Sequence, residues 1–189
     1  VILNGDTPLV RVETVERLVA AHGASGATVT LGAARLADPT GYGRVVRGPD
    51  DAVTGIVEEC DATPGQRRIA EINTGLYAVD AEFLGRALAE LSADNAQGEY
   101  YLTDIVGAAV AAGRPVHALA VEADEVQGVN SRADLARVEG LMRARTCRRW
   151  MEEGVTVLDP VRTWIDATVT IGPETVLAPG VWLEGATVI

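Results

Sequence analysis

A six-residue period near the carboxyl end constrains the fold more than any other feature of this sequence. Aliphatic residues recur at every sixth position, and small or β-branched residues precede them by two. The two columns are Ile165, Ile171, Leu177, Leu183 and Ile189, and Thr163, Val169, Thr175, Val181 and Thr187. Such a period is typical of a parallel β-helix, in which each hexapeptide forms one flat strand. An irregular antiparallel β domain would need turns that interrupt the period.

The two ends of the sequence suggest that it is an internal piece of a longer protein. It opens without Met on the apolar run Val1-Ile2-Leu3-Asn4, which predicts a buried strand over residues 1–4. It stops within the hexapeptide pattern, and a stack of coils needs several repeats and a cap. We therefore expect further coils to follow in the longer protein.

Between these ends, helical and strand patterns alternate, which favours an α/β layer fold. The stretches 44–47 and 53–58, on either side of the turn residues Gly48-Pro49-Asp50-Asp51, indicate a hairpin. His22-Gly23 is expected to end the first helix. The predicted helices cover residues 10–22, 81–91 and 102–112, and the predicted strands cover 27–32, 44–47, 53–58, 72–78 and 115–121.

A long helix is predicted from Ser131, where Ser131 and Asp134 form a capping pattern, to Gly154. We interpret it as a strut between two domains; the alternative is a helix packed on the first domain. The expected domains are a partial α/β domain over residues 1–130, a linking helix over 131–154 and the start of a β-helix over 155–189.

Composition excludes several classes of function. The 189 residues carry a net charge of −11, and all 16 basic residues are Arg, because the sequence lacks Lys. This balance argues against nucleic-acid binding, and the lack of Lys excludes lysine-based chemistry in this stretch. Cys60 and Cys147 fit neither a zinc site nor a disulfide framework. No apolar run approaches a membrane span, and we expect a soluble, cytoplasmic protein.

Asp6 and Asn130 are candidate ligands of a hard cation. Asp6 follows Gly5 after an apolar run, where a carboxylate could hold Mg²⁺ against phosphate oxygens. The alternative for Asp6 is a helix-capping or turn residue. Asn130 offers an amide oxygen, but an Asn just before a helix is often only an N-cap or turn residue.

Three further positions could contact a ligand. Glu58 and Asn73 could bracket a sugar, whose hydroxyl groups need paired acceptors and donors. Gly41, in Gly41-Tyr42-Gly43, could present a backbone amide, although a plain turn is the simpler interpretation. Cys60 and Cys147 are interpreted as structural residues.

Together these segments resemble one family over the whole chain, the bacterial bifunctional N-acetylglucosamine-1-phosphate uridylyltransferase/glucosamine-1-phosphate N-acetyltransferase. The motifs that carry the resemblance, with the hexapeptide repeat after them, are Gly5-Asp6-Thr7-Pro8, Asp38-Pro39-Thr40-Gly41-Tyr42-Gly43-Arg44, Ile56-Val57-Glu58, Glu71-Ile72-Asn73-Thr74-Gly75, Asn95-Ala96-Gln97-Gly98-Glu99-Tyr100-Tyr101-Leu102-Thr103-Asp104 and Gly128-Val129-Asn130.

The resemblance implies a Rossmann-like nucleotidyltransferase domain followed by a left-handed parallel β-helix. It implies that Asp6 and Asn130 hold a catalytic Mg²⁺ and that Gly5 lies beside the nucleotide. The residues implied to contact the N-acetylglucosamine moiety are Gly41, Glu58, Asn73, Tyr101 and Thr103. The implied reaction is attack of N-acetylglucosamine-1-phosphate on UTP, giving UDP-N-acetylglucosamine, a cell-wall precursor, and pyrophosphate.

The sequence departs from the family in two respects. The family's N-terminal Gly-rich loop, with its phosphate-binding Arg and Lys, is not in this sequence, so we expect this piece alone not to turn over UTP. The acetyltransferase residues, which would use acetyl-CoA and glucosamine-1-phosphate in a homotrimer, lie in later coils of the family. Asn4 is given no role.

Two other functions stay open. One is a related pyrophosphorylase acting on glucose- or mannose-1-phosphate, some of which also carry hexapeptide tails. The other is a non-catalytic scaffold or sugar-nucleotide sensor. The runs Glu71-Ile72-Asn73-Thr74-Gly75 and Asn95-Ala96-Gln97-Gly98-Glu99-Tyr100-Tyr101 favour the N-acetylhexosamine enzyme.

Overall fold

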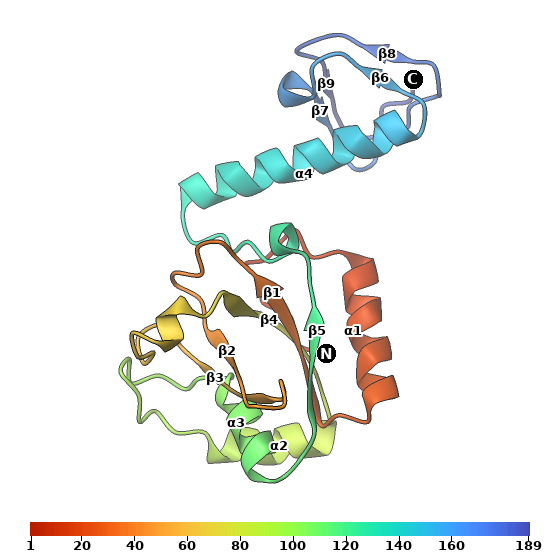
Figure 1. The fold of residues 1–189 in the computed structure, drawn as a ribbon. Coiled ribbons are helices and arrows are strands. Elements are labelled where there is room, and N and C mark those ends of the chain that lie inside the picture. Colours follow the sequence, from red (N-terminus) through yellow and green to blue (C-terminus); the bar gives the residue numbers. More distant parts are fainter. The chain divides into compact units, whose positions relative to one another are not determined.

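The computed structural model describes all residues, 1–189, and they form two compact units (Figure 1). The first comprises Val1–Val126 and the second Gln127–Ile189. Each unit has its own apolar core: two clusters fill the first unit, and a third fills the second. No helix in the chain is both long enough and apolar enough to cross a lipid bilayer.

The first unit is built on one mixed five-stranded sheet with the order β3-β2-β4-β1-β5. Strand β1 runs parallel to β5 and antiparallel to β4, while β2 and β3 form an antiparallel hairpin. The predicted hairpin is therefore confirmed. The strands are β1 (Val29–Arg35), β2 (Arg44–Arg47), β3 (Val53–Val57), β4 (Glu71–Val79) and β5 (Val116–Ala120).

Helices cover both faces of this sheet, because successive side chains of a strand point to opposite faces. Leu18 of α1 (Val12–Ser25) packs with Leu76 on one face. On the other, Leu31 packs with α2 (Ala81–Glu90) and α3 (Asp104–Ala111). Short 3-10 turns lie at Gln66–Arg68 and Ala123–Glu125. The α/β layer fold predicted from the alternating pattern is confirmed.

A bulge interrupts β4. Leu31 of β1 pairs with Tyr77 and Ala33 pairs with Asn73, so three residues of β4 lie opposite the single residue between Leu31 and Ala33. Gly75, in the centre of the bulge, has a φ of 76°, a left-handed conformation that suits glycine. Because of the bulge, the four-residue step from Asn73 to Tyr77 covers a shorter distance than it would in a regular extended strand.

Two predictions for the amino-terminal part are wrong. Residues 1–4 do not form a buried strand: only Ile2 pairs, through one antiparallel bridge with Tyr77, and Val1 is 63% exposed. The chain then turns at Gly5-Asp6. Helix α1 continues through Gly23 and ends at Ser25, because Gly26 adopts the left-handed backbone (φ 62°) that stops a helix.

The second unit begins with the predicted long helix, α4 (Arg132–Glu152). The Ser131 side chain accepts a hydrogen bond from the Asp134 backbone N–H, as the capping pattern predicts. After α4, the backbone of Gly154 is left-handed, with a φ of 91°.

The residues after α4 form coils whose short strands pair in parallel. Strand β6 (Thr156–Val157) pairs with β8 (Val176–Leu177), and β7 (Trp164–Ile165) pairs with β9 (Trp182–Leu183). The second pair and the bridge Thr170–Val188 join residues 18 positions apart, or three hexapeptides. The first pair is 20 apart and spans the 3-10 turn Pro160–Arg162.

The hexapeptide columns point into the coil interior, except at Ile189, which is 49% exposed. Val169, Ile171 and Leu177 are each at most 5% exposed and pack in one cluster. Cys147 and Trp150 of α4 belong to the same cluster, so the last turns of the helix help to fill this core. Cys147 is fully buried, as expected of a structural residue, whereas Cys60 is exposed and that interpretation of it is wrong; both thiols are free.

The buried column predicts a sharp difference between two leucines of the second unit. Leu177 is 4% exposed and Leu158 is 60% exposed. Leu177→Ala should lower the free energy of unfolding by about 2–5 kcal/mol, because it removes buried methyl groups and leaves a cavity. Leu158→Ala should change it by less than about 0.5 kcal/mol. Urea denaturation measures both, and equal losses would contradict the inward orientation of the hexapeptide column.

Candidate functional site

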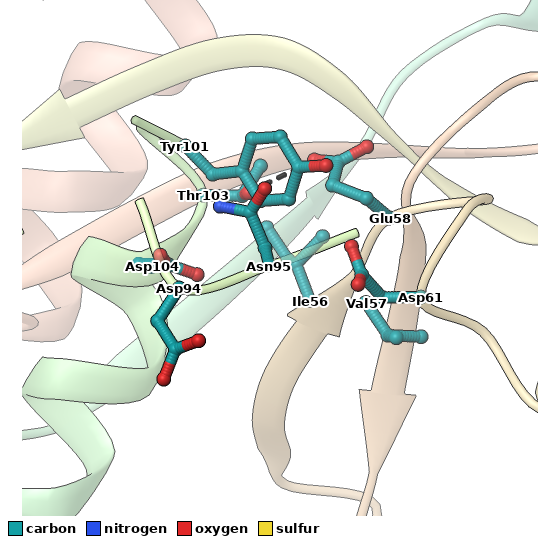
Figure 2. Close-up of a pocket in the computed structure, with 9 residues that line it drawn as sticks. All are labelled: Ile56, Val57, Glu58, Asp61, Asp94, Asn95, Tyr101, Thr103 and Asp104. Carbon is teal, nitrogen blue, oxygen red and sulfur yellow. Dashed lines mark hydrogen bonds between the residues drawn. The ribbon is translucent and has the colours of Figure 1, made fainter. Parts of the chain in front are cut away.

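A polar cavity of about 290 Å³ lies in the first unit, between the end of β3 and the segment before α3 (Figure 2). Its volume lies just below the range for ligand pockets, roughly 300–1,000 Å³. Carboxylates, an amide and hydroxyls provide most of its functional groups, which suits a ligand with several hydroxyl groups. The lining residues are Ile56, Val57, Glu58, Asp61, Asp94, Asn95, Tyr101, Thr103 and Asp104.

Glu58 and Thr103, both predicted to contact a sugar, are joined directly in this cavity. Thr103 Oγ1 donates a hydrogen bond of 2.8 Å to Glu58 Oε1, shown by the dashed line in Figure 2. Thr103 occupies the N-cap position of α3, yet its side chain does not cap the helix. Its hydroxyl instead orients the Glu58 carboxylate and leaves Oε2 available to accept from a ligand.

Tyr101 lines the same cavity. Its hydroxyl donates a 2.7 Å hydrogen bond to Gln97 Oε1. Desolvation, followed by the nearby carboxylate of Asp61, raises the pKa of Tyr101 to about 12. Desolvation and Asp61 also raise the pKa of Asp104 above its ordinary value. The Tyr101 hydroxyl therefore stays protonated at neutral pH.

Asn73 adjoins the cavity through Gly43. The Asn73 backbone N–H donates to the Gly43 carbonyl at 2.8 Å. A Cβ added at Gly43 would lie only 3.0 Å from Glu58 Oε2. The fold thus brings four of the predicted sugar-contacting residues, Glu58, Asn73, Tyr101 and Thr103, to one end of the sheet.

Gly41, the fifth predicted sugar contact, lies in a loop held by an ion pair. Its φ is 85°, and its N–H donates to Glu59 Oε2 at 3.3 Å. The same oxygen accepts a 2.6 Å hydrogen bond from Arg44 Nη2, and Arg44 also donates to the Tyr42 carbonyl. Arg44 is 1% exposed. Its guanidinium holds the pKa of Glu59 below the usual range, chiefly by this hydrogen bond.

Asp6 is exposed in a turn and its carboxylate makes no hydrogen bond or ion pair. It caps no helix, because α1 begins after Arg11, so the helix-capping interpretation is wrong. The alternative interpretation as a turn residue is confirmed. Gly5 beside it has open space on its Cα: a Cβ there would meet no atom within 4 Å. Asn4 packs against Gly75, where any added Cβ would overlap the Asn4 side-chain amide.

Asn130 belongs to the second unit. It does not cap α4, since Ser131 does, but its backbone N–H donates to Asp134 Oδ2 at 3.3 Å. The pairing of Asp6 with Asn130 around one metal ion stays a prediction, because the two residues belong to different units. No group of three or more His, Cys, Asp or Glu side chains is placed to hold a metal ion.

Sequence reasoning missed the residues that support this site. The sequence holds only a weak signal for the Arg44–Glu59 pair. Arg44 is a charged residue next to two valines in a predicted strand, and Glu59 follows directly after the strand predicted to pair with it. Tyr77 and Asn4 had none, because their contacts depend on the bulge at Gly75.

The Arg44–Glu59 ion pair predicts an acid-sensitive contribution to stability. Because the folded pKa of Glu59 is lowered from 4.5, its contribution is present above that value and is lost as the pH falls through the folded pKa. Glu59→Gln should be less stable at neutral pH and lose less stability than wild type below about pH 5. Urea denaturation across pH checks this, with Glu122→Gln, an exposed glutamate without an ion pair, as control. Parallel curves for wild type and Glu59→Gln would contradict it.

Comparison with known proteins agrees with the fold and the motifs. The family model described as "Nucleotidyl transferase" matches residues 1–166. A solved Bacillus anthracis structure, named as a glucose-1-phosphate thymidylyltransferase in complex with a sucrose, aligns with a TM-score of 0.50 and 18% identity. The alignment covers 68% of this chain and 48% of that one, and it supports the fold alone.

Two curated relatives share about half of the residues. "Bifunctional protein GlmU" of Thermobifida fusca is 50% identical over 190 residues, which cover 100% of this chain and 39% of the relative. The protein of the same name from Syntrophotalea carbinolica is 51% identical, over 98% of this chain and 40% of the relative. The chain thus spans about two fifths of their length. It belongs to the nucleotidyl transferase family, and the resemblance found in its motifs is confirmed.

Proposed function

We propose that this chain is part of an enzyme that transfers UMP from UTP to N-acetylglucosamine-1-phosphate, giving UDP-N-acetylglucosamine and pyrophosphate. The observation that carries the proposal is the cavity where Glu58, Thr103 and Tyr101 meet, with Asn73 beside it. Its polar groups suit the hydroxyl and amide groups of an amino sugar. Similarity over the whole chain to proteins named GlmU supports the same activity.

The proposed reaction needs no nucleophile from the protein. A phosphate oxygen of N-acetylglucosamine-1-phosphate attacks the α-phosphorus of UTP in line and forms a new P–O bond. The bond to the β-phosphate oxygen breaks, and pyrophosphate leaves with the electron pair. Positioning and neutralisation of charge supply most of the catalysis in such transfers. A chain without Lys can contribute to this chemistry through its oxygen and amide groups.

Asp6 and Asn130 would hold Mg²⁺, and Gly5 would lie beside the nucleotide. The free, exposed carboxylate of Asp6 fits this role, because Mg²⁺ prefers oxygen ligands and keeps several water molecules. When bound, the ion neutralises negative charge on the phosphate oxygens. Three fifths of the relatives' length lies outside this chain, so other residues of the enzyme would complete the phosphate site.

On the sugar, Glu58 would accept a hydrogen bond through Oε2, since Thr103 occupies Oε1. The Asn73 side-chain amide would donate through Nδ2, because its Oδ1 already accepts two hydrogen bonds. The Tyr101 hydroxyl, which donates to Gln97 Oε1, would accept from the sugar. The Gly41 N–H is held by Glu59 at 3.3 Å, a long contact that a ligand oxygen could replace. Each of these groups orients the sugar phosphate towards the α-phosphorus.

The longer protein would have a second activity. We propose that residues 1–130 belong to its uridylyltransferase domain, that residues 131–154 link the domains, and that 155–189 begin a left-handed parallel β-helix. Parallel pairing at 18 residues and the buried hexapeptide column support this assignment. The later coils would acetylate glucosamine-1-phosphate with acetyl-CoA in a homotrimer. Both reactions would serve cell-wall precursor synthesis in the cytoplasm.

The metal site predicts a selective effect of Asp6→Asn in the full-length enzyme. Pyrophosphate release from UTP and N-acetylglucosamine-1-phosphate should require Mg²⁺ and fall by about 10²-fold or more, because the substitution removes charge that holds the ion. The melting temperature should stay within about 2 °C of wild type, since the carboxylate has no partner in the fold. A matched loss of stability and activity would indicate a structural role.

The sugar site predicts a preference for the acetylated substrate. The full-length enzyme should use N-acetylglucosamine-1-phosphate with a kcat/KM at least about 10²-fold above that for glucose-1-phosphate, because a site built to hydrogen-bond a polar group discriminates against a substrate that lacks it. Glu58→Gln should reduce this ratio, because an amide at this position can turn a donor towards the ligand. Preference for glucose-1-phosphate would favour another sugar pyrophosphorylase, and no turnover by a folded trimer would favour a scaffold.

A further inference from the structure

The bulge in β4 brings together two residues that a regular strand would keep apart. Asn73 and Tyr77 are four positions apart, which in an extended strand corresponds to roughly 13 Å between Cα atoms. With Gly75 left-handed between them, the Tyr77 hydroxyl reaches Asn73 Oδ1 at 2.8 Å. Tyr77 is 1% exposed, so its ring is held firmly in the core against α2 and α3.

The hydrogen bonds decide which way the Asn73 amide faces. The Gly75 backbone N–H can only donate, and it contacts the Asn73 side chain at 3.3 Å, so the atom it meets must be the oxygen. The Tyr77 hydroxyl meets the same oxygen and therefore donates to it. Burial raises the pKa of Tyr77 well above its usual value, which keeps the hydroxyl a donor.

With Oδ1 doubly occupied, Asn73 can offer a ligand only its Nδ2 group, a pure donor. Glu58, whose Oε1 is taken by Thr103, offers a pure acceptor through Oε2. An acetamido group also has a fixed polarity, because its carbonyl only accepts and its N–H only donates. A sugar hydroxyl can rotate to donate or accept, so the direction of the Asn73 amide matters much less to it.

We propose that Tyr77 is a positioning residue that holds Asn73 as a hydrogen-bond donor and thereby helps the site to select an acetamido group over a hydroxyl group. The proposal rests on the proposed function. Neither Tyr77 nor Asn73 is among the residues that line the cavity. Asn73 adjoins it through the hydrogen bond to Gly43, and Tyr77 acts only through Asn73.

Tyr77→Phe in the full-length enzyme tests the proposal, because it removes the hydroxyl and keeps the ring. The KM for N-acetylglucosamine-1-phosphate should rise about five- to tenfold, the effect of roughly one hydrogen bond, with kcat changed less than about twofold. The KM for glucose-1-phosphate should change less than about twofold. Calorimetry, which measures binding without turnover, should show that Tyr77→Phe loses affinity for UDP-N-acetylglucosamine and keeps its affinity for UDP-glucose.

Two further variants separate positioning from general stability. Thr74→Val removes two other buried hydrogen bonds of β4: Thr74 Oγ1 donates to the Gly32 carbonyl at 2.9 Å and accepts from the Leu76 backbone N–H at 3.4 Å. It should lower the melting temperature but leave the ratio of the two KM values unchanged. In an Asn73→Ala background, Tyr77→Phe should have less than about twofold further effect, because the group through which it acts is absent.

The possible results are distinct. A selective loss in Tyr77→Phe that disappears in the Asn73→Ala background supports the proposal. If the wild type is active and Tyr77→Phe keeps its selectivity, or loses it no more than Thr74→Val, Tyr77 has only a structural role and the proposed function stands. If the wild type neither turns over nor binds N-acetylglucosamine compounds, the proposed function fails, and the role of Tyr77 fails with it.

Discussion

The left-handed backbone at Gly75 is the constraint on which the orientation of Asn73, beside the candidate site, depends. It creates the bulge in β4 that places the Tyr77 hydroxyl on Asn73 and leaves room for the Asn4 side chain. Any side chain at position 75 would both strain this backbone and overlap Asn4. The bulge therefore couples the strand that carries Asn73, a predicted sugar contact, to the segment that leads into Asp6. Bulges often serve next to active sites in this way, by redirecting side chains at the end of a ladder.

Around the bulge, contacts among polar side chains determine which hydrogen-bond donors and acceptors the site presents. Thr103 gives up a capping role to orient Glu58, and fully buried Arg44 connects Glu59 to the loop of Gly41. An unpaired charge in such a place would destabilise the fold, so Arg44 and Glu59 depend on each other. The cavity is thus surrounded by side chains whose free donors and acceptors are determined by neighbours rather than by the ligand. Such preorganisation is what the proposed transfer reaction, which proceeds by positioning, would require.

The second unit obeys a different physical rule. Its coils bury one column of aliphatic residues, with Ile171 and Leu177 inside, and α4 adds Cys147 and Trp150 to the same core. The sequence predicts this unit, because the repeat places an aliphatic residue at every sixth position. The strand predicted over residues 1–4 does not form, because an apolar run alone does not provide a neighbouring strand to pair with. Ile2 makes one bridge, and the chain then turns at Gly5.

The sequence by itself determined the alternating helices and strands, the hairpin, the capped long helix, the hexapeptide column and the family, because each depends on local pattern or on motifs in order. It also pointed to Glu58, Asn73, Tyr101 and Thr103. Only the tertiary structure decided that these residues converge, that Arg44 and Glu59 brace the Gly41 loop, and that Tyr77 orients Asn73. The reason is that a hydrogen bond between side chains depends on the register and bulges of paired strands. The periodicity of residues along a single chain predicts neither the register nor the bulges.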